Sequence, residues 1–312
     1  MIPKLLFIIN NLVTPQDTKC SANSKPTSPT GLSDPLGIDS QFTNPVSLEP
    51  CICYNIFLAL KLFNRMRDKI YFASDFHLGV LPKSTSNERE RLIVSWLEAI
   101  KHDAKELYLV GDVFDFWFEY STVVPKGYIR FLGKLAELSD LGVKIILFKG
   151  NHDMWMFSYL KNELNARIID NELILHINGK RFYIHHGDGL GPGDRKYKFL
   201  KSFFRSRTCQ WLFARLHPNL GIGIAQRWSK HSRAASTEEE KFLGNANEWL
   251  IQFAELELRK KHYDFFIFGH RHLPYDVVLS NGSRIINLGE WIHHYTYAEW
   301  DGSELTLRSW TS

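Results

Sequence analysis

The sequence predicts an α+β fold with layered α/β character: a four-layer αββα sandwich in which two sheets pack face to face between helices. Strand and helix patterns alternate from residue 69 to residue 148, which is typical of an α/β core. Three hairpin signatures follow, in which alternating apolar runs flank an Asn-Gly or Asp-Gly pair. A long insertion without a strand pattern separates the first hairpin from the later strands. We therefore also expect a helical cap on the sandwich.

Residues 1–66 do not share this pattern. The segment 14–50 is rich in Ser, Thr, Pro, Asn and Gly. Such a composition buries too little apolar surface to offset the entropy cost of ordering the chain. An apolar run at 52–63 is too short to span a bilayer, and no clean cleavage site follows the short apolar start of the chain. We expect 1–66 to be a disordered or spurious extension, with Met66 as a natural start, and 67–312 to be the folded domain.

Length and composition fit one or two domains, with 312 residues of which 44% are hydrophobic and 23% charged. The net charge of +4 is too small to indicate a nucleic-acid binder by itself. Three of the four cysteines lie before residue 67, which leaves Cys209 alone in the part expected to fold. A disulfide framework is therefore not expected, and a reducing cytoplasm fits the chain.

The elements of the first half follow from the spacing of apolar residues. Short apolar runs indicate strands, and longer amphipathic stretches indicate helices. The expected order is strand 69–74, helix 87–102, strand 106–110, helix 126–141 and strand 143–148. The second helix should stop at Leu141-Gly142, because glycine tolerates the left-handed conformation of a helix cap.

Three turn pairs predict the hairpins of the second half: Asn178-Gly179, Asn281-Gly282 and Asp301-Gly302. Asn-Gly favours a type I′ turn, because both residues tolerate positive φ. A further strand is expected at 263–268. A helix should precede it from about Thr237 to Lys261, because Thr237 and Glu240 have the spacing of a capping box.

The insertion at about 193–243 should form a lid of short, basic, amphipathic helices. Residues 195–241 contain eleven Lys or Arg against three Glu, a local net charge of +8. Phe, Trp, Leu and Ile are interleaved with these charges. Such a surface suits an amphiphile with an anionic head, or an anionic membrane surface.

Seven potential metal ligands follow the strand patterns in one order. Most come directly after an apolar run, where side chains at the carboxyl ends of neighbouring strands converge on one crevice. They are Asp75 and His77 in Asp-Phe-His, Asp112 in Gly-Asp-Val-Phe-Asp, Asn151 in Gly-Asn-His-Asp, His186 in His-Gly-Asp, and His270 and His272 in Gly-His-Arg-His. Imidazole, carboxylate and amide ligands without a thiolate suit Mn, Fe, Zn or Mg, and they argue against a structural zinc site.

These motifs together resemble the calcineurin-like metallophosphoesterase superfamily, whose ligand series is complete and in order from about Lys69 onward. The segments SDFHLG, GDVFDFW and HHGDGLGPGDRKYK, with the insertion after them, are most similar to the UDP-2,3-diacylglucosamine hydrolases of lipid A synthesis. His152 is a departure, because better-known members of that group carry arginine there. The resemblance implies a sandwich of mixed sheets and a hydrolase that uses two divalent metal ions.

The resemblance also implies residue roles. Mn²⁺ is the expected ion, with Fe, Zn or Mg as alternatives. The implied ligands are Asp75, His77 and His272 for one ion, Asn151, His186 and His270 for the other, and Asp112 as the bridge. His152 is expected to act on the phosphoryl group, with Asp153 orienting its ring. Asp115, Asp188 and His185 are expected outside the ligand set.

We expect the chain to hydrolyse a lipid nucleotide, UDP-2,3-diacylglucosamine, to UMP and 2,3-diacylglucosamine 1-phosphate. The expected location is the cytoplasm, with peripheral contact at the cytoplasmic face of the inner membrane, and no nucleic-acid partner is expected. The candidate substrate-binding residues are Arg195, Lys196, Lys198, Trp211 and Phe213. For Trp211 and Phe213 the alternative is the core of a helical subdomain.

Three alternatives stay open at the level of function. The chain could be another metallophosphoesterase, acting on a soluble nucleotide, a cyclic phosphodiester or a phosphoprotein. It could be a non-catalytic scaffold, although the intact ligand set speaks against that. A nuclease of the same superfamily is the third alternative, but the lid shows no regularly spaced stacking platform for bases.

Overall fold

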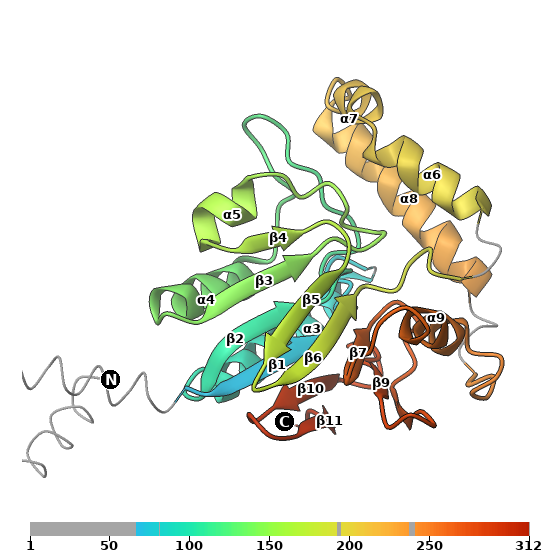
Figure 1. The fold of residues 1–312 in the computed structure, drawn as a ribbon. Helices are drawn as coiled ribbons and strands as arrows, with labels where there is room; N and C mark the ends of the chain where they lie inside the picture. Colours follow the sequence, from blue (N-terminus) through green and yellow to red (C-terminus); the bar gives the residue numbers. More distant parts are fainter. Residues whose placement is uncertain (1–66, 81, 192–194, 237–240, 312) are drawn as a thin grey trace, which may run out of the picture. The chain divides into compact units, whose positions relative to one another are not determined.

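The computed structural model describes residues 67–80, 82–191, 195–236 and 241–311, except the side chains of 83, 195, 196 and 230–236. The expectations for 1–66 and for a capping box at Thr237 fall outside the described residues. The strands are β1 (Lys69–Ala73), β2 (Ala104–Leu109), β3 (Lys144–Phe148), β4 (Arg167–Ile169), β5 (Leu173–Ile177), β6 (Lys180–His185), β7 (Phe265–Phe268), β8 (Tyr275–Val278), β9 (Arg284–Asn287), β10 (Thr296–Trp300) and β11 (Leu305–Ser309). The helices are α3 (Lys83–Ile100), α4 (Ile129–Asp140), α5 (Tyr159–Leu164), α6 (Arg195–Arg205), α7 (Arg207–Phe213), α8 (Pro218–Ser236) and α9 (Trp249–Leu258) (Figure 1).

Both sheets are mixed. The first has six strands in the order β11-β10-β1-β2-β3-β4, and the second has five in the order β5-β6-β7-β9-β8. The strands from β1 to β4 are parallel, and so are β6, β7 and β9. The three hairpins add the antiparallel pairs, and the last of them joins the first sheet through the pairing of β10 with β1.

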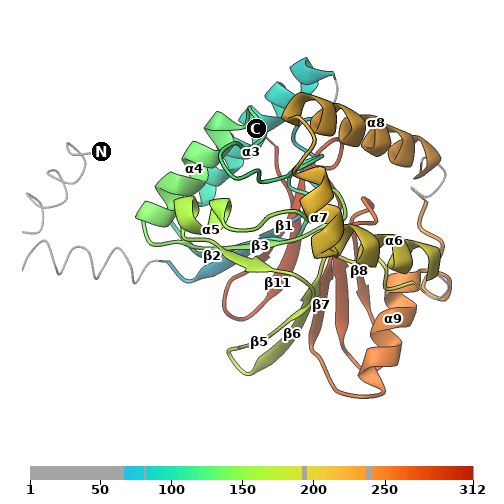
Figure 2. The same cartoon turned by 90° about the horizontal axis from the view of Figure 1, so that it is seen from above.

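Both faces of each sheet are buried, which produces four layers. Along β1, Phe72 packs between the sheets against Phe182, with ring centroids 6.5 Å apart, while Tyr71 packs against Trp96 of α3. This division follows from the two-residue period of a strand. The helices α3, α4 and α5 cover the outer face of the first sheet, and α9 covers the outer face of the second (Figure 2). The predicted four-layer αββα sandwich is confirmed.

The predicted hairpins form, but only the first has the expected turn. Asn178 and Gly179 have φ values of 50° and 77°, as a type I′ turn requires. In each of the other two turn pairs only the glycine, Gly282 or Gly302, has positive φ, and a longer loop connects the strands. The expectation of the same type of two-residue turn in all three hairpins is therefore wrong.

The helix predicted over 237–261 forms as α9, but its predicted start is wrong. Among the described residues, α9 begins at Trp249, and residues 241–248 are not helical. Gly244 has a φ of 83°, which a helix does not allow. The carboxylate of Glu248 accepts hydrogen bonds from Leu243 N and from the Arg271 guanidinium, so tertiary contacts set the start of α9.

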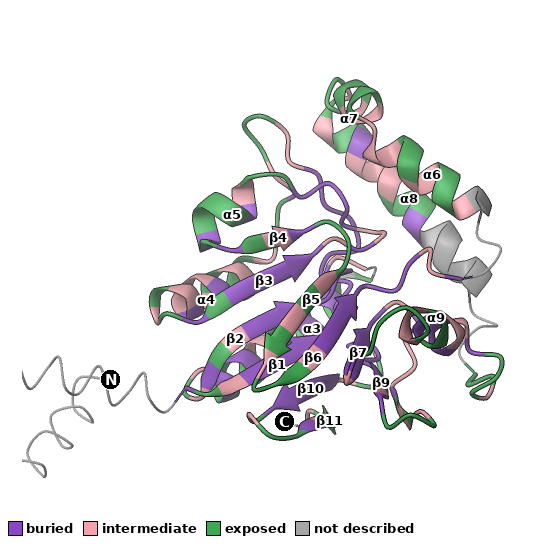
Figure 3. Cartoon of the chain, in the orientation of Figure 1, coloured by how far each residue is buried: buried purple, intermediate pink, exposed green. Residues whose placement is uncertain are grey.

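The helices α6, α7 and α8 form the insertion between β6 and the segment before α9, and we call them the lid. Phe204 and Phe213 of the lid pack with Phe118 and Trp155 of the sandwich loops. Trp155 Nε1 also donates a hydrogen bond of 2.8 Å to the backbone oxygen of Phe204. The central strands are buried, whereas much of the lid is exposed (Figure 3). None of the helices in the described part of the chain has the length and apolar character needed to cross a membrane.

Candidate metal centre

The seven candidate ligands lie on loops at the carboxyl ends of parallel strands. Four of them come from the first sheet: Asp75 and His77 after β1, Asp112 after β2 and Asn151 after β3. The other three come from the second sheet: His186 after β6, and His270 and His272 after β7. The carboxyl ends of parallel strands share one edge of a sheet. The structure brings the seven side chains together there, as the strand pattern predicts.

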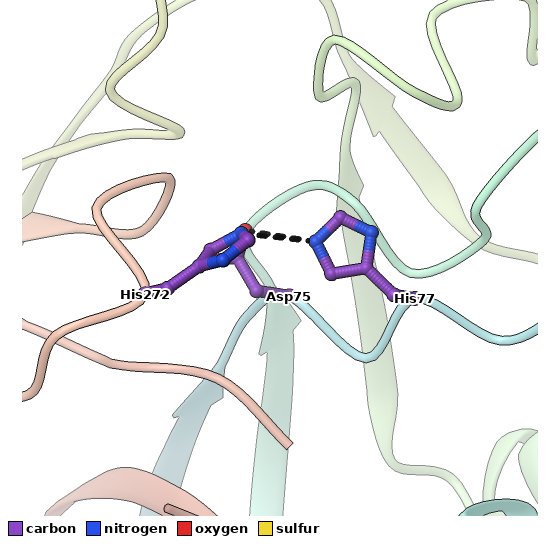
Figure 4. A group of neighbouring side chains, drawn as sticks. All are labelled: Asp75, His77 and His272. Atoms are coloured by element: carbon purple, nitrogen blue, oxygen red, sulfur yellow. Dashed lines mark hydrogen bonds and ion pairs between the residues drawn. The ribbon is translucent and has the colours of Figure 1, made fainter. Parts of the chain in front are cut away.

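Three side chains form the first group of candidate ligands (Figure 4). Asp75 Oδ1 lies 3.6 Å from His77 Nε2 and 3.3 Å from His272 Nε2, and these two nitrogens are 3.0 Å apart. Asp75 Oδ1 is buried without a hydrogen-bond donor, whereas Oδ2 accepts from Ser74 Oγ and His270 N. A buried carboxylate oxygen without a donor is costly. A divalent cation in contact with Oδ1 would remove that cost, so the group fits a metal ion.

Asp112 connects the first group to a second one. Its Oδ2 lies 3.8 Å from His77 Nε2 and 3.4 Å from His186 Nε2. Asp112, His186 and His270 offer ligand atoms that lie within 4.8 Å of one another. Asn151 joins them, with its Oδ1 3.2 Å from His186 Nε2. One carboxylate oxygen thus faces both groups, which is the arrangement that two cations with a shared ligand need.

The ionisation of the two carboxylates and of two of the histidines suits cations, whereas neighbouring carboxylates outweigh burial and raise the pKa of His272 and, to about 10, that of His186. Burial alone would raise the pKa values of Asp75 and Asp112, but neighbouring histidines hold both pKa values well below their usual range. Burial lowers the pKa values of His77 and His270 to about 4. The carboxylates are therefore ionised, and these two imidazoles are neutral. Those are the protonation states that bind divalent cations.

Five of the seven candidate ligands have a left-handed backbone. Their φ values are 56° for Asp75, 44° for His77, 51° for Asp112, 67° for His270 and 57° for His272. Only nine non-glycine residues have positive φ in the described part of the chain, so more than half of them are in this set. Each such residue costs roughly 1–3 kcal/mol, and such strain gathers at functional sites. This strained backbone directs the side chains toward the candidate metal centre directly after the end of a strand.

Two motif glycines let these loops approach closely. A Cβ on Gly150 would lie 2.1 Å from Asp112 Oδ1, and a Cβ on Gly269 would lie 2.0 Å from Ser74 Oγ. Neither position has room for a side chain. The Gly-Asn-His-Asp and Gly-His-Arg-His loops therefore need glycine to bring their ligands against the neighbouring loop.

His152 lies beside both groups. Its ring meets the ring of His77 edge to face at 4.9 Å, and it groups with His77 and Asp112 as a third possible set of ligand atoms. His152 Nδ1 is 3.2 Å from the backbone oxygen of Asp115 and 3.7 Å from Asp115 Oδ1. Ser229 Oγ, from lid helix α8, is 3.0 Å from the same nitrogen. No sequence signal pointed to Ser229, which follows His152 by 77 residues and belongs to no motif.

Asp153 does not orient His152, and that prediction is wrong. The Asp153 carboxylate is buried and accepts three backbone hydrogen bonds, from the N–H groups of Gly150, Val113 and Phe114. Burial raises the pKa of Asp153 to about 7. The side chain ties the loop after β2 to the loop after β3, which is a structural role.

Asp115, Asp188 and His185, which we expected not to be metal ligands, belong to none of the three groups of possible ligand atoms among the described residues. Asp188 accepts a hydrogen bond of 2.7 Å from the Tyr197 hydroxyl and pairs with Lys201 at 2.6 Å. His185 accepts a hydrogen bond from Gly187 N through Nδ1. Asp115 lies beside His152, as described above.

The candidate substrate-binding residues divide into three kinds. Arg195 and Lys196 begin α6, but their side chains are outside the described residues. Lys198 is exposed and lines a cavity of about 420 Å³ between α6 and the loop after β6. Trp211 is 57% exposed, with the Arg215 guanidinium 4.9 Å from its ring. Phe213 is half-buried in the aromatic cluster under the lid, so for Phe213 the structure favours the alternative, a packing role.

Comparisons with known proteins show which family and which relatives this chain resembles. Residues 68–274 match the model of the family described as calcineurin-like phosphoesterases. A UDP-2,3-diacylglucosamine hydrolase of Porphyromonas gingivalis is 45% identical over 258 residues, which cover 78% of this chain and 98% of that protein. A protein of the same name from Haemophilus influenzae is 26% identical over 230 residues, covering 72% and 91%. Among solved structures, the phosphoesterase Yfce from E. coli has a TM-score of 0.38 and 17% identity, covering 77% of this chain and 92% of that one.

Proposed function

Because the chain belongs to the calcineurin-like phosphoesterase family, we propose that it hydrolyses UDP-2,3-diacylglucosamine in lipid A synthesis. Water adds across the diphosphate, one P–O bond of the bridge breaks, and the products are UMP and 2,3-diacylglucosamine 1-phosphate. The name of the Porphyromonas gingivalis relative supports this substrate, since 98% of that protein aligns at 45% identity. The chain would then be a hydrolase acting on a phosphorus anhydride.

The observation that carries this proposal is Asp112 Oδ2, which faces both groups of ligand atoms. Two divalent cations, for which we propose Mn²⁺, would supply activation of water near neutral pH and neutralisation of the phosphoryl oxygens. The proposed ligands are Asp75, His77 and His272 on one side, Asn151, His186 and His270 on the other, with Asp112 shared. Buried Asp75 Oδ1, which lacks a donor, supports the first of these assignments.

His152 is the proposed catalytic residue at the phosphoryl group. Its Nδ1 is engaged by Asp115 and Ser229, which leaves Nε2 for the substrate. An imidazole held in this way suits hydrogen bonding to a phosphoryl oxygen or proton transfer to the departing phosphate.

We further propose that residues 67–312 form one hydrolase domain and that residues 193–243 act as its lid. Exposed aromatic side chains on the lid support binding of acyl chains: Phe199, Phe203, Trp211 and Trp228. Exposed Arg207, Arg215 and Arg227 lie among them in the sequence and suit an anionic surface. Lys198 and Trp211 are the proposed substrate contacts on this lid, and peripheral contact with the cytoplasmic face of the inner membrane is the proposed location.

The test is release of UMP from UDP-2,3-diacylglucosamine, compared with UDP-N-acetylglucosamine, with Mn²⁺ and with EDTA. We expect a rate at least about ten times higher on the acylated compound, because apolar burial of acyl chains is worth about 0.8 kcal/mol per methylene, and no release with EDTA. Asp112→Asn, purified in parallel, controls for a contaminating phosphatase. Equal rates on both compounds would favour a hydrolase of soluble nucleotides, and no UMP from either would refute the proposal.

A further inference from the structure

A serine of the lid reaches the candidate catalytic histidine. Ser229 lies on α8, is only 4% exposed, and donates a hydrogen bond of 2.8 Å from its hydroxyl to Asp115 Oδ1. The same oxygen is 3.0 Å from His152 Nδ1. Asp115 is also buried, at 4% exposure. Hydrogen bonds in such a buried place are electrostatically stronger than at the surface.

The contacts around His152 define its tautomer. The backbone oxygen of Asp115, 3.2 Å from Nδ1, can only accept a hydrogen bond. The single proton of the Ser229 hydroxyl is given to the Asp115 carboxylate, so towards His152 the oxygen is an acceptor as well. Both neighbours of Nδ1 therefore require an N–H there. The lone pair, or the second proton of the charged ring, is then on Nε2.

The position of Ser229 in the chain makes this contact dependent on the lid. Asp115 and His152 belong to the loops after β2 and β3, whereas Ser229 arrives from the insertion between β6 and β7. The lid is held in place next to these loops by the Trp155 bond to Phe204 and by the packing of Phe213. A lid that is displaced from these contacts would take the Ser229 hydroxyl away from His152.

We propose that Ser229 is a positioning residue, through which the docked lid fixes the ring and the tautomer of His152 for reaction. The expected effect of Ser229 on catalysis rests on the proposed function, whereas its effect on the ring and tautomer of His152 does not. Without the hydroxyl, His152 Nδ1 keeps one acceptor within hydrogen-bond distance, the Asp115 carbonyl, with Asp115 Oδ1 3.7 Å away, and the ring is held less tightly in its orientation and tautomer. The lid would then contribute to the chemical step as well as to binding of the lipid.

The kinetic test compares Ser229→Ala with Ser229→Thr, which keeps a hydroxyl at the same carbon. For Ser229→Ala we expect kcat for UMP release to fall about 10–100-fold, part of the 10²–10⁴-fold typical of acid–base catalysis, with KM changed less than about two-fold. Ser229→Thr should restore most of kcat. Gln226→Ala is the matched control, because Gln226 is exposed and lies one turn earlier on α8. A higher KM with unchanged kcat in Ser229→Ala would overturn the proposal.

A second readout does not depend on the substrate. Long-range ¹H–¹⁵N spectra of protein with ¹⁵N-labelled histidine distinguish Nδ1–H from Nε2–H, and His152→Gln identifies the His152 signals. We expect the Nδ1–H form in the wild type and in Ser229→Thr, and a mixture in folded Ser229→Ala. An unchanged tautomer in Ser229→Ala would overturn the proposal. If the wild type releases no UMP, the proposed function fails, while this spectrum still decides the role of Ser229.

Discussion

Removal of one partner from the buried ion pair between Glu248 and Arg271 should destabilise the protein strongly. Arg271 lies between His270 and His272, and its Nη2 and Nε donate to Glu248 Oε1 and Oε2 at 2.9 and 3.1 Å. The two side chains are 5% and 0% exposed, so solvent hardly screens their interaction. Loss of Arg271 leaves the buried Glu248 carboxylate with only the backbone N–H of Leu243 as a hydrogen-bond donor among the described residues.

The magnitude follows from this burial. Breaking a buried, hydrogen-bonded pair costs about 3–5 kcal/mol, and a domain of this size loses roughly 2–4 °C of Tm per kcal/mol. We therefore expect Arg271→Met to lower Tm by about 6–20 °C, and Glu248→Gln to lower it less, because Arg271 keeps its hydrogen bond to the backbone oxygen of Lys241. The double variant should lose less than the sum of the single variants, because the Glu248 charge is then removed together with Arg271. Mn²⁺ affinity should also fall, by about 10–100-fold, since Arg271 holds the loop of two ligands.

The assay is thermal and urea unfolding of metal-free wild type, both single variants and the double variant, with Mn²⁺ titration of each. Lys260→Met is a suitable control, because Lys260 pairs with Glu257 at an exposed position. Exposed pairs contribute about 0–1 kcal/mol. Single variants that cost less than about 1 kcal/mol, or a double variant whose cost equals the sum, would refute the reasoning.

Three further changes test the metal centre. Asp112→Asn should lower kcat/KM more than about 10²-fold, because loss of a metal ligand should cost more than loss of a residue that only hydrogen-bonds to a ligand. Activity with full metal content by elemental analysis would contradict the shared-ligand assignment. Gly150→Ala should lower Mn²⁺ affinity and destabilise the fold by about 1–3 kcal/mol, because its Cβ would meet Asp112 Oδ1 at 2.1 Å; wild-type values in calorimetry and metal titration would speak against the close approach. Asp153→Asn should lower the free energy of unfolding by about 1–3 kcal/mol, since Gly150 N–H loses its acceptor. The tautomer of His152 should be unchanged in this variant, and a changed tautomer would restore the orienting role to Asp153.

The ligand positions could be predicted from sequence because they depend on one rule of sheet geometry. Asp75, Asp112 and His270 each follow a run of apolar residues closely, and the carboxyl ends of parallel strands share one edge. The alternation of strands and helices likewise predicted the four layers. Helix ends differed from prediction by a few residues, as for α3, which begins at Lys83.

The errors arose where contacts distant in sequence decide the outcome. Asp153 is adjacent to His152 in sequence, but three backbone N–H groups take its carboxylate. The helix before β7 starts late because Glu248 is held by Arg271. Ser229 has no motif, and only the packing of the lid shows where its hydroxyl points. The pattern of the last hairpin predicts its strands but not the sheet that it joins.

That last hairpin has a consequence for biosynthesis. On the ribosome, β1, β2 and β3 are available for pairing early, but β1 lacks its partner β10 until residues 296–300 have emerged. All seven candidate ligands are translated before that point. Until then the nascent chain presents an unpaired strand edge beside Tyr71 and Phe72, and such edges promote association between chains. Slow translation of the final segment, or shortage of chaperones at that stage, should therefore reduce the yield of folded protein more than the same delay earlier in the message.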